Sequence, residues 1–263
     1  MDMRGEADIA QVAAVIGDPS RTRVLLALAG GGVLPASALA AEAGVSNSTI
    51  SGHLAKLLDA RLLTVELDGR HRYYRLATTD VARALEQLAL IARPLPVRSL
   101  NADTRAKALL RARLCYDHLA GRLGVAVMSA LQERDILTAE PAGAAGPAGA
   151  AGPAESVEPA EPARTGGEAA PPVYVLTPHG HAELTAFGVD TERLPRRRAS
   201  VRYCVDWAER RHHLAGGLGA ALTARMFALE WLRHGKYRRV VHLTEAGRAG
   251  LVTTFGIPVD RLA

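Results

Sequence analysis

The chain of 263 residues is long enough for two domains, and 48% of its residues are hydrophobic, which suffices for real cores. Its two cysteines, far apart in the sequence, exclude a disulfide framework. No apolar run approaches the roughly 18 residues that span a bilayer, and the N-terminus lacks the apolar segment of a signal peptide. We therefore expect a cytoplasmic protein with no membrane partner.

Charge alone says little about nucleic-acid binding. The formal net charge is +5, but residues 1–95 carry ten basic and ten acidic side chains. The basic excess lies further along, around residues 193–202 and 233–239, and a solvated basic surface is the simpler explanation of it.

Two short helices are predicted at the start of the chain. Apolar residues recur at helical spacing over residues 9–16, and this helix should end near Gly17. Asp18 then caps a second helix, with Pro19 at the first helical position, where its missing amide does no harm. The glycine run 30–32 ends that helix.

The stretch from residue 35 to 76 predicts two more helices followed by a hairpin. Residues 36–43 form a supporting helix, and Gly44 supplies the bend after it. Ser46 caps the next helix, whose apolar stripe packs inward. That stripe consists of Ile50, Leu54, Leu57 and Leu58.

The opposite face of this helix is small and polar, which suits a helix whose N-terminus must approach base edges and phosphates. It carries Ser48, Gly52, Ala55 and Lys56, flanked by Thr49, Ser51 and His53. Two β-rich runs follow, with Asp68-Gly69 as the predicted two-residue turn. Arg70 and Arg72 make the hairpin a basic wing beside the helix.

A helix over residues 79–92 closes this region and has more apolar surface than a lone terminal helix can bury. Together with the first helix it predicts a homodimer surface through residues of about 5–17 and 79–92. Packing onto its own domain is the alternative interpretation.

Residues 8–92 resemble the ArsR/SmtB family of winged-helix transcriptional regulators. The resemblance rests on IGDPSRTRVLLAL, then GVSNSTISGHLAKLLDARLL, then DGRHRYYRL across the wing, in the expected order and spacing. It implies a homodimer that binds an inverted-repeat operator in double-stranded DNA, usually as a repressor, and leaves it when an inducer binds. By this resemblance the DNA contacts come from Asn47, Ser48, Thr49, Ser51, Gly52, His53, Lys56, Arg70 and Arg72.

The metal sites of the family do not carry over. Arsenic and cadmium sensors have a cysteine pair on the supporting helix, where this chain has ASALAAEA, and the helix from Thr79 has no histidine for the zinc site of other members. The sequence therefore names no cofactor, and the inducer could be a small molecule, a metal ion or an oxidant.

The remaining residues, 96–263, predict an α-rich C-terminal sensor or interaction domain. ARLCYDHLAGRLGVAVMSAL resumes as VRYCVDWAERRHHLAGGLGAALTARMFAL, and VYVLTPHGHAELTAFG resumes as RVVHLTEAGRAGLVTTFG, so two similar units are expected at about 111–190 and 200–260. Each is expected to read helix, helix, strand, helix. A Pro/Ala/Gly-rich loop over residues 141–172, expected to be disordered, interrupts the first unit.

Cys115 and His118 are three residues apart and would share a face of a helix, as a two-point metal or thiol site requires. In the second unit the position three after Cys204 is Trp207, so the ligand pattern is not expected to repeat. On a helix His212 and His213 would lie too far from Cys204 to bind the same ion.

Two interpretations of these residues stand. The cysteines are buried core residues, a common fate for free cysteine. Alternatively a pocket binds a soft metal ion, an electrophile or a small organic ligand, and it is lined by Cys115, His118, Cys204, His212 and His213.

The sequence contains no P-loop, no GxGxxG after a strand, no HExxH and no GxSxG, so we do not expect an enzyme. We expect a mainly α fold with small β wings and three alternative functions. These are an inducer-released DNA-binding repressor, a redox or metal sensor using Cys115 and Cys204, and an interaction module that no longer binds DNA.

Overall fold

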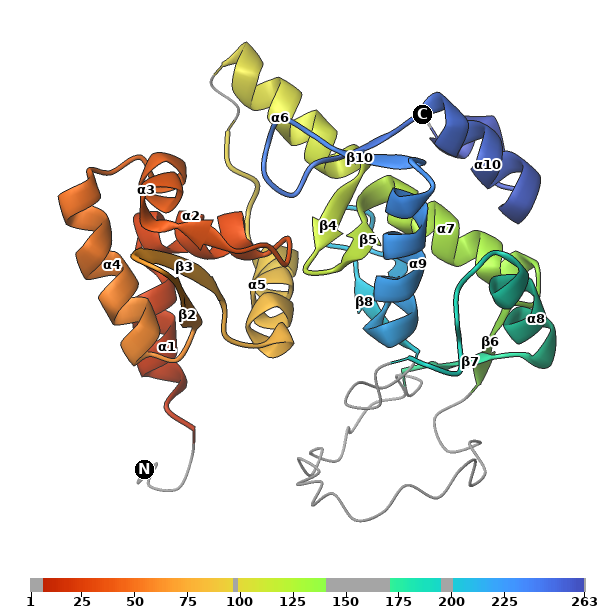
Figure 1. Ribbon diagram of the computed structural model, residues 1–263, viewed down its shortest axis with the longest axis horizontal. Helices are drawn as coiled ribbons and strands as arrows, with labels where there is room; N and C mark the ends of the chain where they lie inside the picture. The colour runs from red at the N-terminus through yellow and green to blue at the C-terminus, as the bar shows by residue number, and fades with distance from the viewer. Residues whose placement is uncertain (1–6, 97–98, 141–170, 195–200, 263) are drawn as a thin grey trace.

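The computed structural model describes residues 7–96, 99–140, 171–194 and 201–262. Two separate hydrophobic clusters organise these residues, one within residues 24–85 and the other within residues 112–262. Figure 1 shows the two corresponding halves side by side along the longest axis. Across the described ranges, the helices are all too short or too polar to cross a lipid bilayer.

The first half has the order of elements of a winged helix-turn-helix domain. Helix α4 lies at the end of the molecule that is furthest from the second half (Figure 1). The elements are α1 (Ile9–Ile16), α2 (Pro19–Leu28), β1 (Leu34–Pro35), α3 (Ala36–Ala43), α4 (Asn47–Asp59), β2 (Leu63–Asp68), β3 (His71–Leu76) and α5 (Thr79–Ile91).

The predicted signals at the helix ends are confirmed. Asp18 caps α2 by accepting hydrogen bonds from the amides of Ser20 and Arg21. Gly44 adopts φ of +70° after α3, a conformation that glycine reaches without strain. Ser46 Oγ accepts from the Thr49 amide at 3.2 Å, so α4 begins where the sequence predicts.

The wing is a three-stranded antiparallel sheet in the order β1-β3-β2. Its turn differs by one residue from the prediction. Asp68 pairs with His71, so the two central residues are Gly69 and Arg70 rather than Asp68 and Gly69. Gly69 has a φ of +57° and Arg70 does not have a positive φ, as in a turn that requires glycine at its first central position.

The second half begins with α6 (Leu100–Arg111), which the sequence analysis did not predict. After α6 the chain repeats one order of elements twice, namely hairpin, helix, hairpin and helix. We name residues 113–186 the first unit and residues 202–255 the second unit. The first unit contains β4 (Arg113–Cys115), β5 (His118–Ala120), α7 (Gly121–Glu133), β6 (Leu137–Glu140), β7 (Val173–Leu176) and α8 (Pro178–Ala186). The second contains β8 (Arg202–Val205), β9 (His212–Ala215), α9 (Gly216–Ala228), β10 (Leu232–His234), β11 (Val241–Leu243) and α10 (Glu245–Phe255), and η1 (Val259–Leu262) ends the described chain.

The predicted order of helix, helix, strand, helix within each unit is therefore wrong. Cys115 and His118 do not lie on a helix but face each other across the hairpin β4–β5. Strands of three or four residues that are buried on both faces give no alternation of polar and apolar residues, so periodicity fails to distinguish them from helix.

The two units cross over one another. Helix α7 packs on strand β9 of the second unit, and α9 packs on β5 of the first. Glycines face both crossings: a Cβ atom on Gly219 would come within 3.2 Å of the Cβ atom of His118, and one on Gly124 within 3.6 Å of that of His213. The hydrophobic core of the second half is consequently shared by both units.

The proposed disordered loop lies outside the described residues except for Pro171 and Pro172. The residues on either side of this segment lie next to each other, because Glu140 pairs with Val173 in the hairpin β6–β7.

Candidate functional site

The polar face of α4 is open to solvent over its first turns. The hydroxyl groups of its first turn contact one another: Ser46 Oγ lies 2.8 Å from Ser48 Oγ and 2.8 Å from Thr49 Oγ1. Ile50, Leu54 and Leu57 on the other face are buried, as predicted. Of the predicted DNA contacts, those with exposed residues are Asn47, Ser48, Thr49, Ser51, Gly52, Lys56, Arg70 and Arg72.

One predicted DNA contact is less accessible. His53 is half-buried, and its Nδ1 atom lies 3.7 Å from the carboxylate of Asp18, the cap of α2. On the wing, Arg75 pairs with Glu66 at 2.8 Å across the hairpin, whereas Arg70 occupies the turn itself.

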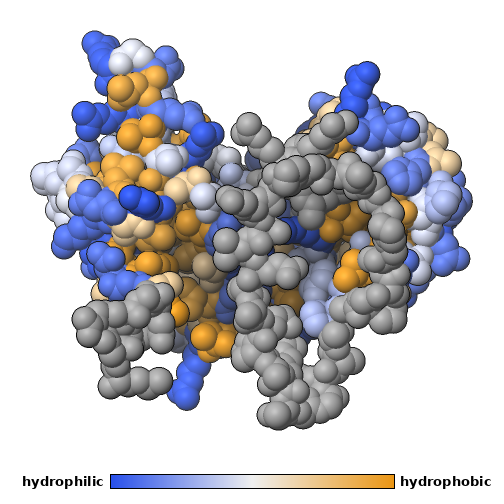
Figure 2. Space-filling view, turned by 90° about the horizontal axis from the view of Figure 1, so that it is seen from below, coloured by the Kyte–Doolittle hydropathy of each residue, from blue (hydrophilic) through white to orange (hydrophobic). Residues whose placement is uncertain are grey.

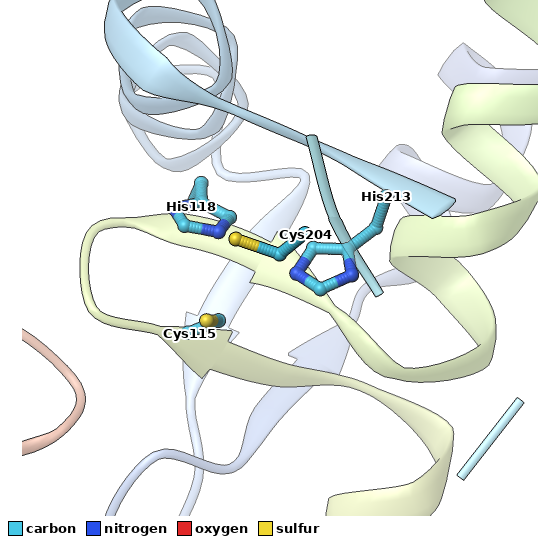
Figure 3. Close-up of side chains that lie close together, drawn as sticks. All are labelled: Cys115, His118, Cys204 and His213. Atoms are coloured by element: carbon cyan, nitrogen blue, oxygen red, sulfur yellow. The ribbon is translucent and has the colours of Figure 1, made fainter. Parts of the chain in front are cut away.

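A second constellation lies in the other half of the molecule. Cys115, His118, Cys204 and His213 converge at one point between the hairpins β4–β5 and β8–β9 (Figure 3), and we call them the Cys/His cluster. With one ligand atom taken from each residue, the two sulfurs and two ring nitrogens all lie within 4.8 Å of one another. All four residues are buried.

Strand register produces this convergence. Cys115 is directly opposite His118 in one antiparallel hairpin, and Cys204 is directly opposite His213 in the other. Residues opposite one another in antiparallel strands project from the same face. Each hairpin therefore presents one thiol and one imidazole.

The expectation that the ligand pattern is not repeated is wrong, and so is the expectation that His213 lies too far from Cys204. The partner of Cys204 is His213 and not the residue three positions later, because the second hairpin has a longer loop. Trp207 belongs to that loop and stacks on the guanidinium of Arg113 at 4.6 Å.

His212, the fifth predicted ligand, lies outside the cluster. Its Nδ1 atom shares a 2.7 Å hydrogen bond with the Tyr174 hydroxyl, and its ring packs against that of Tyr203 with 4.1 Å between centroids. Adjacent residues of a strand point to opposite faces, so His212 and His213 could not both join the cluster.

Three of the four ring nitrogens in the cluster lack hydrogen-bond partners in the part of the chain that the structure describes. Within the described residues, none reaches Nε2 of His118 or either ring nitrogen of His213, and all three atoms are buried. The other nitrogen of His118, Nδ1, lies 3.3 Å from the Asp117 carboxylate. Buried polar atoms are nearly always hydrogen-bonded, so these three nitrogens are candidate ligand atoms.

The pKa values of the two cysteines are shifted in opposite directions, and so are those of the two histidines. The hydrogen bond with Cys204, followed by burial, raises the pKa of Cys115 well above its usual value, and the same bond lowers that of Cys204. Burial tends to lower the pKa of His118, but the nearby Asp117 carboxylate and the Cys115 thiol outweigh it and raise the value to about 9. Burial and the neighbouring charge of His118 lower the pKa of His213 to about 3.

A buried ionic network adjoins the cluster, and sequence reasoning missed it. Arg113, two residues before Cys115, donates to Asp206 at 2.9 Å and reaches Glu86 of α5 at 3.5 Å. Arg239 also pairs with Glu86. Asp206, two residues after Cys204, accepts further bonds from the amides of Gly121, Ala208 and Glu209.

The cluster also lies near the winged-helix half of the molecule. The amide of Tyr116, in the turn between Cys115 and His118, donates to the carbonyl of Ala29 just after α2. A cavity of about 760 Å³ reaches both cysteines and is bounded on its other side by Thr79, Arg83 and Glu86 of α5.

The fold of the first half and the exposed polar face of α4 define the class of this protein as a winged helix-turn-helix DNA-binding protein. A second half, beginning at α6, follows this domain. A helix-turn-helix domain family model matches residues 16–66. The chain is 37% identical over 242 residues to the uncharacterized HTH-type transcriptional regulator YdfF of Bacillus subtilis, covering 92% of this chain and 94% of YdfF. It is also 36% identical over 86 residues to the HTH-type transcriptional regulator CmtR of Mycobacterium tuberculosis, covering 33% of this chain and 72% of CmtR.

A solved structure resembles part of the chain. The homodimeric winged helix-turn-helix DNA-binding domain of a possible ArsR-family regulator from Mycobacterium bovis is 25% identical and covers 36% of this chain and 100% of that domain, with a TM-score of 0.30. On the sequence relationship to YdfF, this chain belongs to the HTH-type transcriptional regulators and is a DNA-binding transcriptional regulator.

Proposed function

We propose that the protein is a homodimeric repressor that binds an inverted-repeat operator and leaves it when an inducer binds to the second half of the chain. The observation that carries this proposal is the exposed polar edge of α4, which lies away from the second half (Figure 1) and beside the arginines of the wing. Nothing within the described residues has to move for that edge to enter a major groove.

The two parts of this surface have different roles. The start of α4, at Asn47 and Ser48, reads base edges, because short polar side chains let the helix approach the groove floor. Arg70 and Arg72 of the wing contact phosphates, which gives affinity without sequence preference.

The second copy of the chain binds through α1 and α5. Large apolar side chains there are open to solvent: Ile9 is 75% exposed and Ile91 is 82% exposed, with Val12 and Leu88 nearby on the same two helices. Hydrophobic surface gathers over the winged-helix half in Figure 2. Burying this face in a symmetric dimer places two copies of α4 to read two half-sites.

The second half arose by internal duplication and serves as the sensor. Matching contacts in the two units support this: Thr177 caps α8 and bonds the Ile136 carbonyl, while Thr244 caps α10 and bonds the Trp231 carbonyl. Because each unit supplies one cysteine and one histidine, the duplicated fold brings two matched ligand pairs to one place.

The proposal is tested by fluorescence anisotropy of the full chain on duplex DNA from its own promoter region, at several salt concentrations. We expect nanomolar, salt-dependent binding that competitor DNA does not displace, with two chains per site. Salt-insensitive or absent binding would favour the interaction module, and a protein monomeric on DNA would contradict the dimer.

A further inference from the structure

We propose that the Cys/His cluster is a binding site for a single Zn²⁺-like divalent cation, held by the thiolates of Cys115 and Cys204 and the imidazoles of His118 and His213. The site lies between the two units of the second half, each of which supplies two ligands. It is distinct from the supporting helix and from α5.

The donor set is that of a tetrahedral zinc site. Two thiolates and two imidazoles are a common combination for Zn²⁺, with bond lengths of about 2.3 Å to sulfur and 2.0–2.1 Å to nitrogen. Tetrahedral geometry with these bonds separates donors by roughly 3.3–3.8 Å. The four side chains lie within 4.8 Å of one another, so a small inward movement completes the coordination.

The outer contacts of the cluster fit a metal site as well. A metal-binding histidine usually directs its other ring nitrogen to a carboxylate, which fixes the ring and its tautomer. His118 does this with Asp117 at 3.3 Å, and its Nε2 atom faces the two sulfurs with no hydrogen-bond partner among the described residues. A disulfide between the cysteines would leave that nitrogen, and both of those on His213, still unsatisfied.

Charge balance favours a divalent ion. The ion binds thiolates and neutral imidazoles, so every proton on the four ligand atoms leaves on binding, and the resulting centre of one divalent cation and two thiolates is neutral. A neutral centre is suited to a site where His213 is 0% exposed, because an isolated charge there would carry a large desolvation cost. The cavity that reaches both cysteines supplies the path of entry.

Occupancy of the metal site also changes the affinity of the chain for its operator. This step rests on the proposed function. The hairpin that carries Cys115 and His118 contacts the winged-helix half at two points: Tyr116 bonds the carbonyl of Ala29, and Arg113 reaches Glu86 of α5. An ion that draws the two hairpins together changes the position of α5, and with it the spacing of the two α4 helices in the dimer.

The metal site is tested on the full, reduced, metal-stripped chain by titration with Co²⁺ and by competition with Zn²⁺. We expect one equivalent to bind, with thiolate-to-cobalt charge-transfer absorption and the strong visible bands of a tetrahedral centre. Cys204→Ser and His118→Asn should weaken Zn²⁺ binding by more than about 100-fold, and Asp117→Asn by roughly 10–100-fold as an outer contact. His212→Asn, one residue from a ligand but outside the cluster, is the matched control and should bind as the unmodified chain does.

Two results would overturn the metal site: no binding of Co²⁺ or Zn²⁺ to the reduced chain, or equal weakening in His212→Asn and His118→Asn. Circular dichroism separates a lost ligand from a lost fold, and Cys115→Ser provides a second ligand variant of nearly the same shape.

The coupling step has its own readout. Zn²⁺ loading should weaken operator binding by about tenfold, within the usual range of coupling between two sites, and Cys204→Ser should abolish the change. If the chain takes up Zn²⁺ while operator affinity stays constant, the coupling is wrong and the site stands. If neither form binds DNA, the proposed function fails instead.

Discussion

The recognition surface on α4 and the Cys/His cluster are built in opposite ways. The first is continuous in sequence, open to solvent and free of buried charge. The second joins residues about ninety positions apart, is closed from solvent, and adjoins a buried ionic network that reaches α5. A surface that meets DNA can be assembled from one helix, whereas a site that must exclude water needs several elements around it.

The largest expected effect comes from the buried network that lies between the two regions. Glu86→Gln removes the carboxylate shared by Arg113 and Arg239, and we expect the free energy of unfolding to fall by about 3 kcal/mol, as for other buried ion pairs that lose one partner. Glu66→Gln removes a partner of Arg75 on the exposed wing and should cost less than about 1 kcal/mol. Urea denaturation measures both, and equal losses would contradict the contrast.

Ser48→Glu should act on DNA binding alone. A carboxylate at the start of α4 meets the negative field of the groove, and we expect operator affinity to fall by about 100-fold or more. Thr253→Glu places the same charge at an exposed residue of α10 and should leave the affinity for the operator unchanged. Anisotropy measures both variants, and Zn²⁺ uptake by Ser48→Glu should match that of the unmodified chain.

Ile91→Asp should weaken the dimer by about tenfold or more, because each protomer loses an apolar contact and buries a charge in its place. Val259 is also exposed, on η1, and Val259→Asp serves as its control. Sedimentation equilibrium gives the dissociation constants. A dimer that is insensitive to Ile91→Asp would mean that another face joins the two copies.

The smallest effect is expected from Arg70→Ala on the wing. Binding to all sequences should weaken by a few-fold, and the slope of log affinity against log salt should fall by about 0.9, the value for one phosphate contact. Arg233→Ala, an exposed arginine in the other half, should change neither quantity. Loss of sequence preference in Arg70→Ala would instead place this side chain on a base.

The contrast between the α4 surface and the Cys/His cluster also decides how much of each could be predicted from the sequence. In α4, thirteen residues of helical periodicity and a serine cap act locally, so its start and its buried stripe are both predictable. The hairpins of the second half have strands of three or four residues that are mostly buried, and such strands carry no periodic signal. The register that joins Cys204 to His213 is set by long-range packing of α7 on β9.

One signal in the sequence did point to the cluster. His-Leu-Ala-Gly occurs at 118–121 and again at 213–216, and aligning these segments places His213 opposite His118 despite the longer loop after Cys204. Reading Cys115 and His118 as helical neighbours concealed this match. The ionic network had no comparable signal, because Glu86, Arg113 and Asp206 come together only in three dimensions.

The division of the four ligands between two hairpins makes the site dependent on the whole chain. A fragment that stops before residue 204 contains one thiol and one imidazole, which is half of a tetrahedral set. During synthesis the winged helix emerges long before the second hairpin does. A newly made chain therefore presents its DNA-binding surface before it contains all four ligands, and a response to the ion would report that synthesis has passed the second hairpin.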